Sequence, residues 1–343
     1  MNTLLKHSLL AASLALAFGA SAAQNVLTAV KAGAAPKLDG VANDAVWANA
    51  PEIKVAMRGG KNLPEGKTNA TLKAAYTADT LYILVQYDDA TNSLRRAPYQ
   101  KQANGTWIKL KDPADKGGDN NLYYEDKLAF IWNIGGSIKA FGKTGCFEMC
   151  HDNEPPKPYG NKYTETAGEL GDIWHLKSVR GGLSLGQIDN QYVDHTRYDK
   201  EKAEGAGRHS DKKTGGGYAN MNLVNGKPEF MNKDGKAANK GGTYWLNVAD
   251  KAPFDDSKFV AGDEVASILV EKFQGERGVI DVGGKWEGGK YTFEIARPLK
   301  TTSKYDVQFD KLDGAYEFGV AVFDNAQVRH AYHRGPLVLK FAK

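Results

Sequence analysis

The chain has 343 residues, a formal net charge of +4 at pH 7 and 41% hydrophobic residues. This length is enough for one large domain or two smaller ones. Charges of both signs are interspersed, and no basic stripe carries interleaved aromatic residues, so the composition argues against nucleic-acid binding.

The first residues have the order of an export signal. A short basic start at 6–7 is followed by an apolar run at 8–18 and by small residues at 19–23. The apolar run is too short to span a bilayer, and no later stretch reaches 18 uncharged apolar residues. We therefore predict a cleavable signal over 1–23, a periplasmic location without a membrane span, and one mature domain over 24–343.

Most of the mature chain has the pattern of short strands between turns. Ile53–Met57 forms a short apolar strand, and 71–88 alternates around a break at 78–80, as a hairpin does. Further strands are expected at 127–132, 173–177, 264–271, 290–297 and 316–323. No window of 12 or more residues in the mature chain has a 3.6-residue period. The predicted fold class is therefore mostly β, with a β-sandwich as the expected form.

Residues 199–242 differ from the rest of the chain in composition. This stretch is dense in Gly, Lys, Asn and Asp and has few apolar residues. We predict a long insertion loop here that is ordered at most in part.

The segment Gly145–His151 carries the chemistry. It contains Cys146 and Cys150, separated by three residues, with His151 directly after the second cysteine. Covalent haem attachment needs two thiols for the two vinyl groups and a following histidine for the iron, usually with two residues between the cysteines. We predict one covalent haem c, held by both cysteines, with His151 as the proximal iron ligand.

Two other interpretations of the cysteines remain open. A disulfide between Cys146 and Cys150 is common in exported proteins, but it leaves His151 unexplained. A zinc site needs a further ligand, and no matching second pair is near in the sequence.

A low-spin haem iron also needs a sixth ligand. His175 is the first candidate, because it lies 24 residues after the proximal histidine on a strand-like segment beside Trp174. His330 and His333 follow the last strong strand and are the next candidates. Lower alternatives are Met57, Lys177 and an open sixth position.

Several segments resemble the ethylbenzene dehydrogenase-type haem-binding domain family. The likeness is carried by Phe141–His151 and Gly168–Lys177, with further matches at 121–127, 189–194 and 320–325. The family includes the γ-subunits of ethylbenzene dehydrogenase and related molybdenum enzymes, as well as free-standing exported cytochromes. The opening segment 37–47 also resembles β-sandwich modules of the ninth carbohydrate-binding family.

The resemblance implies a β-sandwich with long loop insertions around a haem, and single-electron transfer. In the γ-subunits the haem is b-type with methionine and lysine as axial ligands, which is why Met57 and Lys177 are kept as candidates. This chain departs from that pattern through Cys146, Cys150 and His151.

We therefore expect an electron carrier or a relay subunit rather than an enzyme. Its partners would be a redox donor and acceptor, such as a molybdenum oxidoreductase or a respiratory complex. Two alternatives are a ligand- or sugar-binding sandwich module with a Cys146–Cys150 disulfide, and a haem sensor with an open iron site. No nucleophile triad, acid pair or phosphate loop supports catalysis by side chains.

Overall fold

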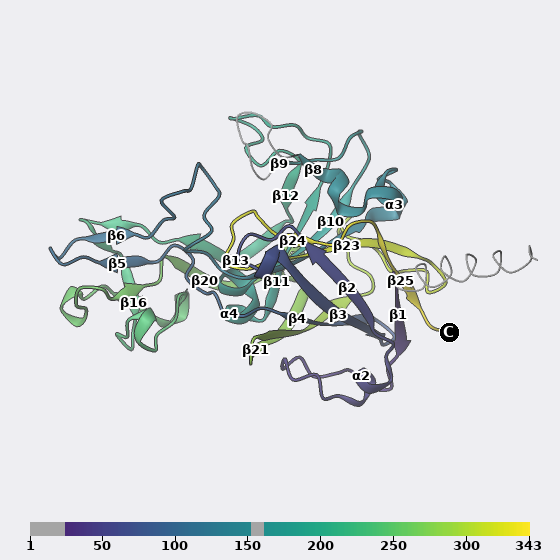
Figure 1. Ribbon diagram of the computed structural model, residues 1–343, viewed down its shortest axis with the longest axis horizontal. Coiled ribbons are helices and arrows are strands. Elements are labelled where there is room, and N and C mark those ends of the chain that lie inside the picture. The colour runs from purple at the N-terminus through teal and green to yellow at the C-terminus, as the bar shows by residue number, and fades with distance from the viewer. Residues whose placement is uncertain (1–24, 152–160) are drawn as a thin grey trace, which may run out of the picture.

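The structure is a computed structural model that describes residues 25–151 and 161–343. The export signal predicted over 1–23 lies outside these residues. Figure 1 shows a large body of strands with a smaller lobe at its left. In the ranges that the structure describes, no helical segment has the length and apolar character that a bilayer crossing requires.

Ten strands of the main body are hydrogen-bonded into one closed ring. The ring closes between β1 (Val26–Lys31) and β3 (Lys67–Tyr76), which pair in parallel through Ala29 and Ala74. In ring order the strands are β1 (Val26–Lys31), β25 (Leu337–Phe341), β23 (Tyr316–Phe323), β7 (Lys127–Asn133), β10 (Gly171–Lys177), β11 (Gln187–Val193), β21 (Ile280–Glu287), β22 (Lys290–Pro298), β4 (Thr80–Asp88) and β3 (Lys67–Tyr76). The shorter strands β2 (Ile53–Arg58), β12 (Arg208–Ser210) and β24 (Ala331–Tyr332) pair with members of this ring. The predicted mostly β, sandwich-type fold is confirmed.

Apolar side chains from alternating strand positions fill the interior of this ring. In β2, Ile53, Val55 and Met57 are buried, whereas Lys54 and Ala56 between them are exposed. Successive strand side chains point to opposite faces, so alternation in the sequence becomes one apolar and one polar face. At the centre of the core, Trp132 packs against Phe318 and Trp174, with ring centroids 4.7 and 4.8 Å apart.

The predicted strands are present with small changes in their bounds. The hairpin expected over 71–88 is formed by β3 and β4, whose register pairs Tyr76 with Leu81. The strand expected over 264–271 is divided into β19 (Glu264–Val265) and β20 (Ile268–Gly275). The α-helices in the described residues are short, and they are α2 (Ala45–Asn49), α3 (Phe141–Thr144) and α4 (Leu183–Leu185).

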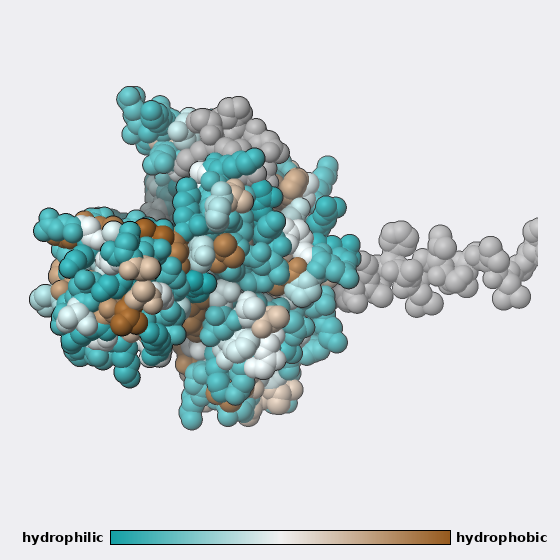
Figure 2. All heavy atoms as spheres, turned by 60° about the vertical axis from the view of Figure 1, so that its left-hand side comes forward, coloured by the Kyte–Doolittle hydropathy of each residue, from teal (hydrophilic) through white to brown (hydrophobic). Residues whose placement is uncertain are grey.

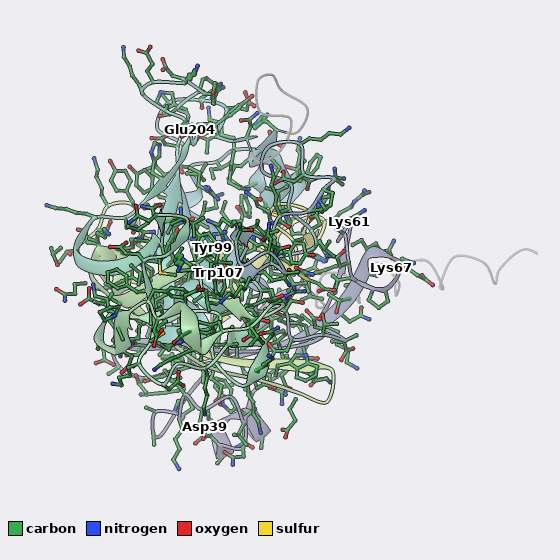
Figure 3. The ribbon with its side chains drawn as sticks, turned by 90° about the vertical axis from the view of Figure 1, so that its left-hand side faces the viewer. Asp39, Lys61, Lys67, Tyr99, Trp107 and Glu204 are labelled. Atoms are coloured by element: carbon green, nitrogen blue, oxygen red, sulfur yellow. The ribbon has the colours of Figure 1, made fainter. Side chains whose placement is uncertain are left out.

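The smaller lobe combines two distant parts of the chain. Its elements are β5 (Tyr99–Lys101), β6 (Trp107–Lys109), β13 (Lys213–Asn220), β14 (Leu223–Val224), β15 (Lys227–Pro228), β16 (Phe230–Asn232), β17 (Leu246–Asn247), β18 (Lys251–Pro253) and the two strands over 264–275. The lobe has its own core, in which Trp107 packs edge-on against Phe254 and Phe259. Figure 3 looks onto this lobe, with Tyr99 and Trp107 near the middle of the view.

The expectation of a long insertion loop over 199–242 that is ordered at most in part was wrong. This segment forms β12 to β16, and β13 pairs with β20 through Tyr218 and Val270. The composition concealed these strands because each of them buries at most one residue, such as Met231 of β16. Figure 2 shows apolar residues gathered at the surface of the lobe, where Ile108 and Val224 are exposed.

Candidate functional site

An open cavity of about 110 Å³ lies on the outer face of β7, β10 and β23. The other face of these strands carries the aromatic core. The register of the three strands places small and apolar residues side by side on the cavity floor. This floor consists of two cross-strand rows, Gly319–Ile131–Ile173 and Ala321–Ala129–His175.

The cysteine segment covers one side of this cavity. It runs from α3 through a 3-10 turn, η3 (Gly145–Met149), into the short strand β8 (Cys150–His151). Phe141, Cys146 and Met149 are buried in an apolar cluster with side chains of β7 and β10, which anchors the segment to the sheet. Figure 1 shows α3, β8 and the facing β9 (Asn161–Lys162) close to β10 and β12.

The two cysteines are free thiols, and both line the cavity. Cys146 is buried, and burial together with the neighbouring Cys150 raises its pKa to about 12. Cys150 is partly exposed, and its Sγ lies 3.2 Å from the Nζ of Lys162. The two thiols therefore differ in environment, because Cys146 is buried whereas Cys150 is partly exposed and contacts the ammonium group of Lys162.

His175 lies on the cavity floor with one ring nitrogen unused. Its Nδ1 is 3.4 Å from the Oε1 of Gln191, whereas its Nε2 is buried and has no hydrogen-bond partner among the described residues. Burial, followed by the charges of Lys177 and Lys127, holds the pKa of His175 well below its usual value. A neutral imidazole with an unpaired nitrogen at a cavity is the form that binds a metal.

Of the two other histidines predicted as distal ligands, His330 lines the cavity and His333 does not. His330 lines the same cavity, and its Nδ1 is 2.7 Å from the carbonyl oxygen of Val328. The Nδ1 of His333 is 3.2 Å from the carbonyl oxygen of Ala56, and its ring is not part of the cavity lining.

The two lower-ranked candidates, Met57 and Lys177, do not line the cavity. Met57 is fully buried in the main core on β2. The ammonium group of Lys177 pairs with Asp189 and donates to the hydroxyl of Tyr218 at 3.1 Å. The structure therefore brings His175 and His330 together with Cys146 and Cys150, and it does not bring Met57 or Lys177 into this cavity.

His151 faces away from the cavity in this structure. It follows Cys150 in β8, so the two side chains point to opposite sides of the strand. Its ring stacks on Tyr163 with centroids 3.5 Å apart, and its Nε2 is 3.3 Å from the carbonyl oxygen of Tyr163. The prediction that His151 is an iron ligand therefore requires the backbone at 150–151 to turn.

Two basic residues at the cavity were missed by the sequence analysis. Lys162 comes from β9, and Arg208 comes from β12, where it pairs with Val193 of β11. Both belong to stretches without a recognisable motif, and only strand pairing brings them to the cavity. They give an otherwise apolar cavity a positive edge that can hold an anionic group of a ligand.

The sequence model of the family described as "Ethylbenzene dehydrogenase" matches residues 44–335. The chain belongs to this family. The resemblance predicted from the sequence is thereby confirmed, and the matched range contains the cavity, both cysteines and all candidate ligands.

The other comparisons add little to the family assignment. No curated protein matches the chain. Two solved structures of a family 9 carbohydrate-binding module from Caldicellulosiruptor kristjanssonii, in complex with cellotriose and with glucose, both give a TM-score of 0.33, at 10% and 9% identity. They cover 93% and 92% of this chain and 95% and 94% of their own. A putative carbohydrate-binding protein from Bacteroides uniformis gives a TM-score of 0.38 at 8% identity, over 92% of this chain and 98% of its own.

Proposed function

We propose that this member of the ethylbenzene dehydrogenase family is an exported c-type cytochrome that carries one covalent haem and passes single electrons. The observation that carries the proposal is the meeting of three groups at one cavity. The free thiols of Cys146 and Cys150 line the same apolar space as the unpaired Nε2 of His175.

The residues around the cavity suit a haem. Cys146 and Cys150 would hold it through thioether bonds, and His175 would supply a neutral imidazole to one side of the iron. The floor is apolar, as a porphyrin face requires, whereas Lys162 and Arg208 offer positive charge to its carboxylates. When bound, the haem supplies a one-electron iron couple, and the chain sets its potential through ligands and burial.

The export signal predicted over 1–23 supports a periplasmic location and a redox partner there. A covalently held cofactor suits a carrier outside the cytoplasm, because the cofactor is not lost by dissociation. We propose that the partner is a molybdenum oxidoreductase or a respiratory complex, in keeping with the family.

The alternative of a sugar-binding module has weaker support among the aromatic residues. Trp107 is buried edge-on against Phe254 and Phe259 and forms no surface platform. Stacking platforms for sugars need an exposed ring face.

The decisive test is whether the mature chain carries a covalently attached haem. The full chain is expressed with haem-maturation factors and exported, and its mature mass, its haem stain on a denaturing gel and its pyridine haemochrome spectrum are measured. One added haem mass that survives acid-acetone extraction supports the proposal. A mature chain without added haem mass, with both thiols free or joined in a disulfide, would refute it.

A further inference from the structure

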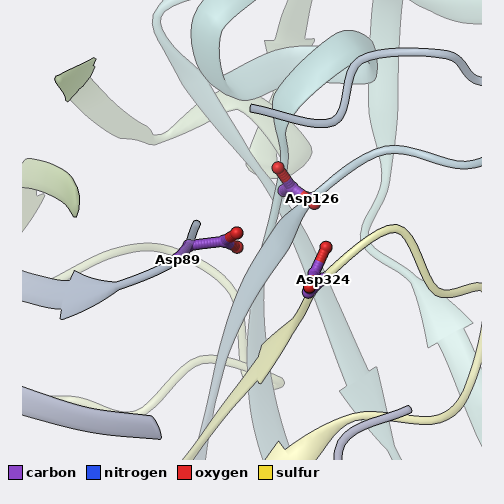
Figure 4. Close-up of side chains that lie close together, drawn as sticks. All are labelled: Asp89, Asp126 and Asp324. Carbon is purple, nitrogen blue, oxygen red and sulfur yellow. The ribbon is translucent and has the colours of Figure 1, made fainter. Parts of the chain in front are cut away.

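Three buried carboxylates lie together at a place that the haem proposal does not use. Asp89, Asp126 and Asp324 are 2%, 0% and 8% exposed, and one oxygen of each lies within 4.8 Å of the others. They come from the end of β4, the start of β7 and the end of β23 (Figure 4). Among the described residues, none of the three forms an ion pair with a lysine, arginine or histidine.

Hydrogen bonds hold the carboxylates in place but leave part of their capacity unused. Asp126 accepts from the hydroxyl of Tyr291 and from the backbone N–H of Asn325, both at 2.8 Å. In contrast, the Oδ2 atom of Asp89 is buried without a hydrogen-bond partner in the described part of the chain. Figure 4 shows the carboxylate of Asp89 pointing toward Asp126 and Asp324.

A second polar group at this place lacks a partner. The hydroxyl of Tyr87 is buried and has no hydrogen bond within the described ranges. Burial, followed by the charges of Asp126, Asp89 and Asp324, raises the pKa of this hydroxyl, which places it near the three carboxylates. An unpaired carboxylate oxygen and an unpaired hydroxyl, both buried, indicate a missing ligand.

Taking three negative charges out of water is costly unless a cation accompanies them or protons neutralise them. We propose that Asp89, Asp126 and Asp324 together bind one Ca²⁺ ion. The donors are all oxygens, as Ca²⁺ prefers, without the nitrogen or sulfur that zinc selects. Calcium binds oxygen at 2.3–2.6 Å, so two of its ligands lie at most about 5 Å apart, in agreement with the spread of this group.

The site also lies next to the cavity wall. Asp324 directly follows Phe323, and Gln327, Val328 and His330 from the same segment line the cavity. A cation shared by Asp324 with Asp89 and Asp126 ties this segment to two other strands. The ion is therefore expected to order the wall of the cavity, whether or not the cavity holds haem.

The test measures calcium binding to the full mature chain as purified, after dialysis against a chelator. Isothermal titration with Ca²⁺ and with Mg²⁺ is combined with thermal unfolding and hydrogen exchange over 323–330. Asp89→Asn removes one charge where the carboxylate has an unused oxygen, and Asp324→Asn is a second variant in case the first is poorly folded. Asp88→Asn is the matched control, because this neighbouring side chain is 68% exposed.

We expect one Ca²⁺ per chain with a Kd of about 1 mM or tighter, the range of extracellular calcium modules. The two variants should weaken binding at least about tenfold, and the control should bind as the wild type does. Calcium should also raise the melting temperature and slow hydrogen exchange over 323–330. No calcium binding by a folded wild-type chain, with stability that rises as the pH falls, would mean that protons occupy the site and would overturn the proposal. Tighter binding of Mg²⁺ than of Ca²⁺, or unchanged calcium binding in both variants, would overturn it too.

Discussion

Cys146 packs directly on Gly319. A Cβ atom at position 319 would lie 2.7 Å from the Cβ and 3.1 Å from the Sγ of Cys146. The absence of a side chain on this residue of β23 therefore lets the attachment segment settle against the cavity floor.

Gly319→Ala tests whether this contact positions the thiol. The added methyl group should push Cys146 off the floor, lower the amount of haem per chain and destabilise the fold by about 1–3 kcal/mol, as overpacking does. Pyridine haemochrome absorbance per mole of protein measures the first effect and urea unfolding the second. Gly33→Ala is the control, since nothing lies within 4 Å of a Cβ there. Full haem loading in the Gly319 variant would show that the close contact is not needed for attachment.

His175→Ala should change the spin state of the iron. Because the Nε2 of His175 faces the cavity without a hydrogen-bond partner among the described residues, loss of this side chain should convert a low-spin oxidised spectrum into a high-spin one while the covalent haem is retained. Optical and electron paramagnetic resonance spectra of the oxidised protein measure this. His333→Ala is the control, because His333 does not line the cavity. A low-spin spectrum that survives the loss of His175 would point to His330 as the ligand.

The two thiols should differ in reactivity before haem attachment. In the haem-free chain at pH 8, iodoacetamide should modify Cys150 about tenfold faster than Cys146, because Cys150 lies beside Lys162 and Cys146 is buried with a raised pKa. Mass spectrometry of the alkylated peptides measures both rates. Lys162→Met should slow the reaction of Cys150, whereas Lys200→Met, at an exposed site, should not. Faster modification of Cys146 would contradict the environments described here.

Asp189 should make the fold sensitive to acid. Burial raises its pKa, but ion pairs with Lys177 and Arg277 outweigh burial and lower the pKa to about 2 from 3.8. A carboxyl whose folded-state pKa is depressed contributes stability above its unfolded value and loses it as the pH falls. The free energy of unfolding should therefore fall between about pH 4 and pH 2.

Asp189→Asn should remove this pH dependence. At pH 7 the variant should be less stable by about 3–5 kcal/mol, because Lys177 and Arg277 lose their buried partner. The difference from wild type should shrink toward pH 2, as urea unfolding across this pH range would measure. Asp88→Asn, at an exposed position, should follow the wild type throughout. A constant difference across the range would mean that Asp189 acts through packing rather than charge.

Patterns that depend on near neighbours along the chain were readable without coordinates. Alternating apolar residues predicted β3, β4, β7, β10, β22 and β23, because strand side chains alternate between two faces whatever the strand pairs with. The spacing of Cys146, Cys150 and His151 is equally local, so it predicted a haem and named its attachment points. In the structure, the same alternation puts Trp174 in the core and His175 on the opposite face, at the cavity.

Register and strand pairing determined the rest. They put His175 in one cross-strand row with Ala129 and Ala321 on the cavity floor. They also stacked His151 on Tyr163 and brought Arg208 to the cavity. The acidic cluster joins Asp324 to Asp89 and Asp126, which precede it by 235 and 198 positions, and no local pattern indicates it. Residues far apart in the sequence become neighbours in this way when the sheet closes into a ring. That closure depends on how many strands pack together at once, and not on the residues adjacent in the sequence.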